Sequence, residues 1–385
     1  MKPFHDFPPK GPPRDVPPLL TTFGGEKVST KADWERVRRP ELLAKFLDEA
    51  YGRRPADAER PQNIRFESAV PDKTMMDGKA VRKIVTCTYG GRYGERSFTF
   101  TAFIPIQNRP APAFVLICNR LPEKNIDPER RVKSGFWPAE EIVARGYAAI
   151  AFYNGDVAPD QTWRFEEGVF GAYQKPWERD TRSWGILSAW AWGASRVLDW
   201  IEREPLLDAK HVGVVGHSRG GKTALLAGAT DTRFAMICSN DSGCGGAKLN
   251  HMELPASEHI DQILRLGYWF CGNFAKYRCR EAEMDFDQHM FAALIAPRLL
   301  AIASASDDAW AGPEGEFQTG LLASPAWALY GKRGLVANGG RFPGADRPLQ
   351  DGCISYHMRT GEHNLTPYDW NRYMDFADAH GWRGE

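Results

Sequence analysis

One pentapeptide constrains the fold of this chain more than any other feature of its sequence. Gly216-His217-Ser218-Arg219-Gly220 matches the pattern G-x-S-x-G, and it stands between an apolar run at 212–215 and a helix-forming run that begins at Lys222. Between a strand and a helix, this pattern is typical of a nucleophile elbow, where glycines relieve the crowding around a strained serine. We therefore predict that Ser218 is a nucleophile; the alternatives are a tightly packed structural turn or a phosphate-binding turn.

The rest of the sequence predicts short buried strands that alternate with helices. Helical patterns cover 138–145, 182–202 and 221–228, and two β-rich runs at 81–89 and 97–106, separated by Gly90-Gly91, predict a hairpin. This alternation predicts a mainly parallel, doubly wound sheet between helices, the three-layer sandwich of the α/β-hydrolase fold. The buried strands are predicted from apolar runs at 113–118, 147–152, 211–216, 234–240 and 298–304.

We predict a single domain over residues 1–385. Residues 1–30 are rich in proline and polar groups, which predicts an extended arm on the surface. Thr30 then has the position of an N-cap and Asp33 completes a capping box, so a helix is expected to begin there. Residues 241–297 are rich in aromatic and charged groups, and we expect them to form an insertion or lid beside the substrate.

Composition narrows the classes of partner. The 49 basic side chains balance the 49 acidic ones, and no long basic run occurs, so nucleic acid is not an expected partner. No apolar segment approaches the ~18 residues of a membrane span, and the first residues lack the layout of a signal peptide. Seven cysteines form no C-x-x-C pair, which argues against a structural zinc site. A disulfide remains an option among Cys244, Cys271, Cys279 and Cys353.

A serine hydroxyl needs a base, and the base needs a third group that orients it. In this fold the order along the chain is serine, acid, histidine, and His363 lies far downstream in a polar loop. We predict His363 as the base, and we expect its near rival His357 to be a hydrogen-bonded histidine of the surface or the core.

Two aspartates are candidates for the acid. Asp308 follows the strand predicted at 298–304, the usual place for the acid in this fold, and its neighbour Asp307 is expected to be an exposed loop carboxylate. Asp241 ends the strand after the elbow helix and could instead cap a turn. We favour Asp308, with Asp241 as a supporting or alternate acid.

Longer motifs surround the pentapeptide and recur along the chain. The serine motif extended by Arg219 and Lys222 is far more specific than G-x-S-x-G alone. Further motifs lie at 38–43, 51–55, 239–247, 268–274, 285–289, 293–298, 307–317 and 356–363. Together with the segment 216–222, they resemble a known family, the glucuronoyl esterases of carbohydrate esterase family 15, over almost the whole chain.

The resemblance implies an activity and several site residues. It implies hydrolysis of esters between 4-O-methyl-glucuronic acid on xylan and lignin alcohols, with Arg219 at the oxyanion. By the same resemblance Lys222, Glu258 and Trp310 contact the sugar. In that family the acid occupies the position of either Asp241, usually a glutamate in fungal members, or Asp308. His217 replaces a cysteine of fungal members, so their disulfide beside the serine cannot form here.

Residue chemistry gives some of these positions independent support. Arg219 and Lys222 put cations at a helix N-terminus, where they oppose the dipole, so a functional use is favoured over capping or solvation. Trp310 could be plain packing, but it stands next to the proposed acid.

We expect a Ser218–His363–Asp308 acyl-transfer enzyme that needs no metal or organic cofactor, acts on glucuronoxylan or lignin–carbohydrate esters, and is a monomer. The resemblance implies a secreted or periplasmic location. A broader esterase, such as one that deacetylates xylan, and a non-catalytic carbohydrate-binding relative are the alternatives.

Overall fold

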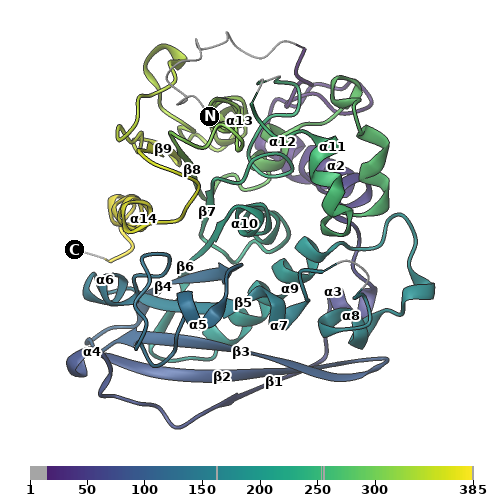
Figure 1. Ribbon diagram of the computed structural model, residues 1–385. Coiled ribbons are helices and arrows are strands. Elements are labelled where there is room, and N and C mark those ends of the chain that lie inside the picture. Colours follow the sequence, from purple (N-terminus) through teal and green to yellow (C-terminus); the bar gives the residue numbers. More distant parts are fainter. Residues whose placement is uncertain (1–14, 162–163, 253, 255, 384–385) are drawn as a thin grey trace.

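A computed structural model describes residues 15–161, 164–252, 254 and 256–383. Its centre is a nine-stranded sheet (Figure 1). The strands are β1 (Asn63–Ser68), β2 (Ala80–Gly91), β3 (Gly94–Pro105), β4 (Ala111–Cys118), β5 (Ala148–Tyr153), β6 (Leu207–His217), β7 (Met236–Asn240), β8 (Leu299–Ala305) and β9 (Ile354–Arg359). Their order is β1-β2-β3-β5-β4-β6-β7-β8-β9. The six strands β4 to β9 are parallel to one another, and β1, β2 and β3 extend one edge of the sheet as antiparallel partners.

Helices cover both faces of this sheet (Figure 1). On one face, α9 (Ile186–Ile201), α10 (Arg219–Thr230), α12 (Gln288–Ala293) and α13 (Pro313–Ala328) contribute to the larger apolar core. On the other face, α6 (Ala139–Ala144) and α14 (Pro367–Ala379) pack in a second core. The predicted three-layer α/β-hydrolase fold is therefore confirmed, and all five predicted buried strands are present.

Four details differ from the sequence-based expectations. The hairpin turn lies at Arg92-Tyr93 because the pairing of β2 with β3 continues to Gly91 and Gly94. Helix α9 begins at Ile186 rather than at residue 182. Strand β1 was not predicted because it is a mostly exposed edge strand without an apolar run. Strand β9 was not predicted because its buried side chains include a tyrosine, a histidine and an arginine.

The predicted helix start at Thr30 is confirmed. The Thr30 hydroxyl accepts the Asp33 N–H and the Asp33 carboxylate accepts the Thr30 N–H. Four segments, α1 (Lys31–Asp33), η2 (Trp34–Arg38), α2 (Arg39–Phe46) and η3 (Leu47–Tyr51), follow without a break. Residues 1–14 of the predicted N-terminal arm lie outside the described residues.

Short helices make up most of the segment 241–297, whose role as an insertion or lid stays a prediction. They are α11 (Ile260–Ile263), η5 (Leu264–Trp269), η6 (Gly272–Tyr277), η7 (Glu281–Glu283) and α12. All seven cysteines are free, so the disulfide considered above is wrong. The other short helices are α3 (Ala56–Glu59), α4 (Met75–Gly78), α5 (Pro122–Asn125), α7 (Asn154–Val157), α8 (Gly168–Tyr173), η4 (Pro176–Glu178) and η8 (Asn338–Gly340).

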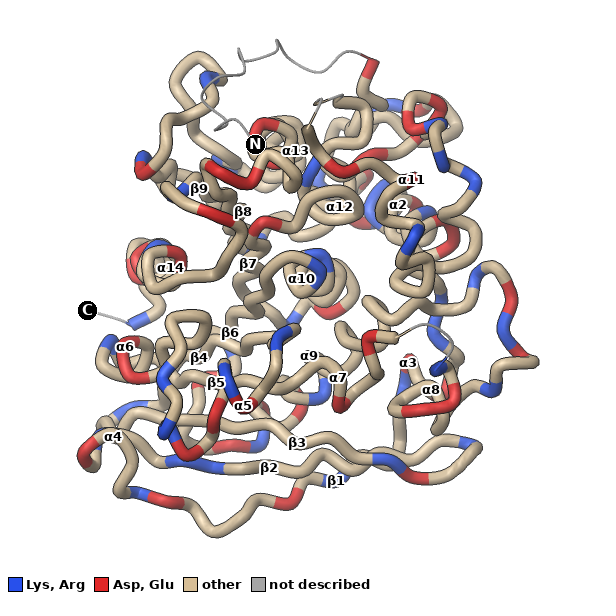
Figure 2. The backbone as a smooth tube through the Cα atoms, viewed as in Figure 1, with Lys and Arg blue, Asp and Glu red and all other residues tan. Residues whose placement is uncertain are grey.

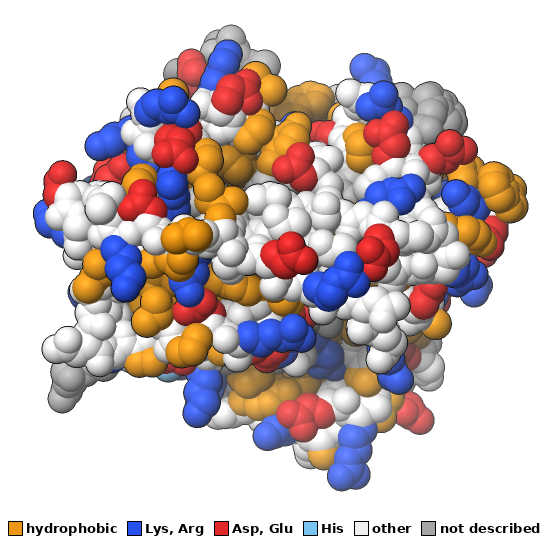
Figure 3. Space-filling model, turned by 90° about the horizontal axis from the view of Figure 1, so that it is seen from below, with side chains coloured by type: hydrophobic (Ala, Val, Ile, Leu, Met, Phe, Trp, Pro, Cys, Tyr) orange, Lys and Arg blue, Asp and Glu red, His pale blue; other side chains and the backbone are white. Residues whose placement is uncertain are grey.

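Charge is distributed evenly over the described residues. Figure 2 shows Lys and Arg interspersed with Asp and Glu along the backbone, and on the face shown in Figure 3 neither sign forms a continuous field. This mixture matches the net charge of zero, and it provides no basic footprint on that face for a polyanion. No helix among the described residues is long and apolar enough to cross a membrane.

Candidate active site

Ser218 lies in the sharp turn between β6 and α10. Its φ of 57° and ψ of −125° are rare for a residue with a side chain, and such a conformation costs on the order of 1–3 kcal/mol. The Ser218 N–H donates to the Asn240 carbonyl at 2.8 Å, while the Ser218 carbonyl accepts from Gly221 and Lys222 in the first turn of α10. The side chain remains partly exposed. The fold thus holds Ser218 in the strained conformation of a nucleophile elbow.

The glycines of the pentapeptide are required by close backbone approaches. A Cβ on Gly216 would lie 2.0 Å from the carbonyl oxygen of Gly220, and a Cβ on Gly220 would lie 3.2 Å from the carbonyl oxygen of Ile117. A side chain at position 216 would therefore push α10 away from β6. This is the collision that the sequence pattern predicted.

His363 lies beside the elbow and is hydrogen-bonded to an aspartate. Its Nδ1 is 2.5 Å from Oδ2 of Asp308, which is buried, while the His363 side chain is 40% exposed. The His363 ring also packs against His217, the residue before Ser218, with ring centroids 4.3 Å apart. An imidazole whose Nδ1 is bonded to a carboxylate has Nε2 available for a proton from a substrate or a nucleophile.

Asp241 is close to the same histidine but has different contacts. One carboxylate oxygen of Asp241, one of Asp308 and one ring nitrogen of His363 lie within 4.8 Å of one another. Asp241 Oδ2 accepts the Asn364 N–H at 3.3 Å and lies 3.6 Å from the Arg359 guanidinium. Asp241 therefore contacts the backbone of the loop that carries His363.

Electrostatics also separates the two acids. Burial raises the pKa of Asp241 well above its ordinary value, and the nearby carboxylates of Asp308, Glu316 and Asp369 add to this rise while Arg359 opposes it. A raised pKa favours the neutral acid, which stabilises an imidazolium less than a carboxylate does. The geometry and this shift both favour Asp308 as the partner of His363.

His217 is a buried neutral neighbour of His363. Burial lowers its pKa well below the ordinary value, and the proximity of His363 lowers it further. Its Nδ1 is 2.6 Å from Oδ1 of Asn240, and its Nε2 is 3.5 Å from the Arg120 guanidinium. A neutral ring whose Nδ1–H donates to Asn240 presents Nε2 as an acceptor toward Arg120.

Arg219 is held at the start of α10 by two partners from neighbouring loops. Its Nε forms an ion pair with Asp160 at 2.5 Å, and its Nη2 donates to the Asn119 carbonyl at 3.0 Å. Asp160 also accepts the indole N–H of Trp269 at 2.8 Å. These contacts fix the guanidinium next to the serine.

Lys222, Glu258 and Trp310, which the resemblance assigns to the sugar, are brought together in the structure. Lys222 Nζ donates to the carbonyls of Ser242 and Cys244 and to Oε1 of Glu258, at 2.5, 2.7 and 2.9 Å. The Glu258 N–H donates to the Trp310 carbonyl at 2.8 Å, and the Trp310 side chain is 43% exposed. Because an ammonium has three donors, Lys222 is fully engaged by the protein, whereas Glu258 and Trp310 keep exposed atoms.

Three residues beside the site can be compared with the sequence analysis: it predicted the surroundings of His357 and Asp307, and it missed the role of Arg359. His357 is a buried core histidine bonded to Asp369 at 2.9 Å, as predicted, and Asp307 is exposed, as predicted. Arg359 was missed: it donates to Asp369 and to the carbonyls of Glu362 and Asn364 on both sides of His363. An arginine inside a β-rich run was the only signal for this role.

Glu316 was also missed. This buried carboxylate accepts the N–H groups of Ser242 and Gly243 at 2.8 and 2.9 Å through Oε1, and the hydroxyl of Ser304 at 2.7 Å through Oε2. Burial raises its pKa to about 7. Glu316 thus connects α13 to the turn that follows Asp241 and to β8.

Comparisons with known proteins agree on one family. A family model described as glucuronyl esterase, fungi, matches residues 95–331. The chain is 33% identical over 96% of its length to a carbohydrate esterase of an unknown prokaryotic organism, of which it covers 90%. It is 30% identical over 81% of its length to a 4-O-methyl-glucuronoyl methylesterase of Podospora anserina, of which it covers 60%. The solved structure of a glucuronoyl esterase from Solibacter usitatus superimposes with a TM-score of 0.87 at 35% identity, covering 96% of this chain and 98% of that one.

Proposed function

The chain belongs to the glucuronoyl esterases, carbohydrate esterase family 15, and we propose from this premise that it cleaves esters between 4-O-methyl-glucuronic acid on xylan and alcohols of lignin. Members of this family are carboxylic ester hydrolases. The observation that most supports the proposal is the hydrogen bond between His363 and Asp308 directly beside the elbow of Ser218.

We propose a two-step acyl transfer. Ser218 Oγ attacks the carbonyl carbon of the uronate ester as His363 Nε2 accepts the hydroxyl proton, and Asp308 stabilises the resulting imidazolium. Collapse of the tetrahedral intermediate breaks the bond to the alcohol oxygen, which takes the proton from His363. Water then attacks the acyl carbon as His363 accepts its proton; the second tetrahedral intermediate breaks its bond to Ser218 Oγ, which takes that proton back, and glucuronic acid is released.

The start of α10 would stabilise the developing negative charge. The Arg219 N–H belongs to the first helical residue after the nucleophile, the position that supplies an oxyanion donor in this fold. The Arg219 guanidinium, fixed by Asp160 and the Asn119 carbonyl, adds a positive charge next to it. Donors that are already oriented do not have to reorganise during the reaction.

We propose that Glu258 and Trp310 bind the sugar and that Lys222 positions Glu258. A carboxylate accepts sugar hydroxyls, an exposed indole offers a face for the ring, and the buried ammonium of Lys222 holds the Glu258 side chain in place.

A comparison of substrates tests the proposed function. We expect hydrolysis of benzyl glucuronate with a much higher kcat/KM than of p-nitrophenyl acetate, and covalent labelling of Ser218 by a fluorophosphonate. A preference for acetyl esters would favour the broader esterase, and no labelling would favour a non-catalytic carbohydrate-binding protein.

A polymeric plant substrate suits a secreted or periplasmic enzyme, and we propose that location for this protein. We also propose that the protein acts as a monomer.

A further inference from the structure

Arg120 has surroundings that the proposed reaction does not yet explain. It follows β4 directly, its guanidinium lies 4.4 Å from the centre of the Phe136 ring, and one of its nitrogens is 3.5 Å from His217 Nε2. His217 in turn touches the ring of His363. Arg120 is thus one residue removed from the catalytic imidazole, and it is only partly buried.

The charge of Arg120 is not neutralised by the protein. Within the described residues no carboxylate lies within 4.0 Å of its guanidinium, although most buried or half-buried arginines of this chain have an acidic partner or several carbonyls. Burial lowers the pKa of Arg120; Cys118 and the more distant carboxyl of Asp241 oppose this shift, and the nearby cations Arg219 and Arg359 add to it. A guanidinium held on an aromatic ring among other cations has unused capacity to bind a ligand.

The sheet order places Arg120 on the side of the elbow away from the proposed sugar site. Strand β4 borders β6 on one side, and β7 borders it on the other, followed by β8. Glu258 and Trp310 belong to the β7 and β8 side, since Glu258 contacts the turn after β7 and Trp310 follows β8. An ester bound across Ser218 with its sugar on that side directs its alcohol toward the loop after β4.

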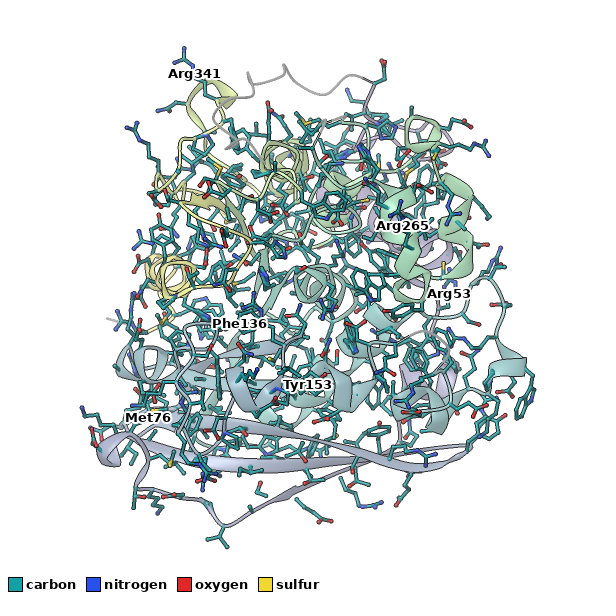
Figure 4. All side chains as sticks on the ribbon, in the orientation of Figure 1. Arg53, Met76, Phe136, Tyr153, Arg265 and Arg341 are labelled. Carbon is teal, nitrogen blue, oxygen red and sulfur yellow. The ribbon has the colours of Figure 1, made fainter. Side chains whose placement is uncertain are left out.

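That loop, residues 119–136, also offers apolar surface. Leu121 and Val132 are 52% and 45% exposed, and Phe136 closes the loop by packing edge-on against His217 at 5.8 Å. In the view of Figure 4, Phe136 and Tyr153, the last residue of the neighbouring strand β5, both lie below α10. Exposed apolar side chains and a flat cation that rests on a buried aromatic ring suit an aromatic ligand better than a sugar.

We propose that Arg120 and Leu121 form a subsite for the aromatic ring of the leaving alcohol, with the Arg120 guanidinium stacked on that ring and supported from behind by the buried ring of Phe136. The subsite rests on the proposed function. The leaving oxygen must receive its proton from His363, so the ring attached to it lies next to the groups that surround this imidazole. The guanidinium of Arg120, which contacts His217 beside this imidazole, offers a flat face for an aromatic ring.

The test compares benzyl glucuronate with methyl glucuronate, which share the acid and differ in the alcohol. In Arg120→Ala, kcat/KM for the benzyl ester should fall roughly 5- to 20-fold more than for the methyl ester. Arg120→Lys keeps the charge but loses the plane, so it should lose part of the same preference. Arg131→Ala, an exposed arginine of the same loop, is the matched control and should leave the ratio unchanged.

Two results would overturn the subsite. An equal loss of kcat/KM for both esters would assign Arg120 to the oxyanion or to the positioning of His217, and no loss for either ester would show that the ring binds elsewhere. If Arg120→Ala does not fold, Leu121→Ser decides, because its exposed side chain can change without loss of structure and should also lower the benzyl to methyl ratio. Failure of the proposed function is a separate result: the wild type would then hydrolyse neither glucuronate ester. In that case, the ratio of kcat/KM for benzyl acetate to that for ethyl acetate would test the same preference for an aromatic alcohol.

Discussion

The two walls of the site are built in different ways. The proposed catalytic groups Ser218, Asp308 and His363 follow the ends of β6, β8 and β9, so the parallel sheet itself brings them together. The proposed sugar side depends on Glu258, which comes from a segment of short helices and is fixed by Lys222 and by the Trp310 carbonyl. In the proposed function, the groups at the carboxyl ends of the strands act on any ester, whereas the Glu258 side discriminates between esters. Variants in the two regions should therefore differ in which substrates they affect.

The largest effect is expected for the nucleophile. Ser218→Ala should lower turnover of every ester by at least about 10⁴-fold, because no covalent intermediate can form. Turnover of benzyl glucuronate and of p-nitrophenyl acetate measures this, and an unchanged thermal midpoint shows that the fold is intact. Ser68→Ala, at an exposed position of β1, is the control. Retention of more than about a tenth of the activity would reject Ser218 as nucleophile.

The next effect distinguishes the two acids. Asp308→Asn should lower kcat by roughly 10³- to 10⁴-fold, because the amide cannot stabilise the imidazolium of His363. Asp241→Asn should cost far less, since Asp241 contacts the Asn364 backbone and its raised pKa favours the neutral form that an amide mimics. The kcat of each variant on benzyl glucuronate decides the matter. The reverse ranking would move the catalytic acid to Asp241, and similar moderate losses would mean that both carboxylates share the role.

The placement of the groups at the carboxyl ends of β6, β8 and β9 is also the part of the site that could best be predicted from the sequence. The turn around Ser218 can be predicted from the pentapeptide alone, because the close approaches that favour glycine are local. Gly216 lies against the backbone of Gly220, and Gly220 lies against the adjacent strand β4. Asp308 and His363 followed from the order of groups in the fold. The flanking strands were visible as apolar runs, whereas β9 was hidden by its buried polar side chains.

The supporting contacts could not be predicted from the residues alone. Lys222 meets Glu258 across 36 positions of sequence, and Glu316 meets Ser242 across 74, so no local pattern records either pair. Arg359 is close in sequence to the loop that it holds, but its role depends on carbonyls, which have no sequence signature. Family resemblance pointed to Lys222 and Glu258; only the structure joins them through an ion pair.

A smaller and more selective effect is expected on the sugar side. Glu258→Gln removes the carboxylate, and Lys222→Met removes the group that positions it, so each should lower kcat/KM for glucuronate esters by about tenfold, ~1.5 kcal/mol. Hydrolysis of p-nitrophenyl acetate should hardly change, because acetate has no hydroxyls to bond.

The double variant tests whether the two residues act together. If Lys222 acts through Glu258, the double variant should lose clearly less transition-state binding free energy for glucuronate esters than the two single variants lose together. If Lys222→Met lowers kcat/KM equally for glucuronate esters and for p-nitrophenyl acetate, Lys222 does not act through the sugar site and instead supports the elbow or the oxyanion.

The last effect concerns Glu316, where the two regions meet, and it is a change of stability with pH rather than of activity. Burial raises the pKa of this carboxyl from 4.5 to about 7, so between these values the folded protein binds more protons than the unfolded chain. Unfolding free energy should therefore fall as pH rises through this window, by roughly 1–3 kcal/mol from this group. Glu316→Gln stays neutral at every pH and should remove that part of the slope. Urea unfolding at pH 5 and pH 8 should show the variant gaining on the wild type at the higher pH, whereas Glu67→Gln, exposed on β1, should show no such gain. A constant difference between variant and wild type would mean that Glu316 is already ionised at pH 5 and that its hydrogen bonds to Ser242, Gly243 and Ser304 outweigh its burial.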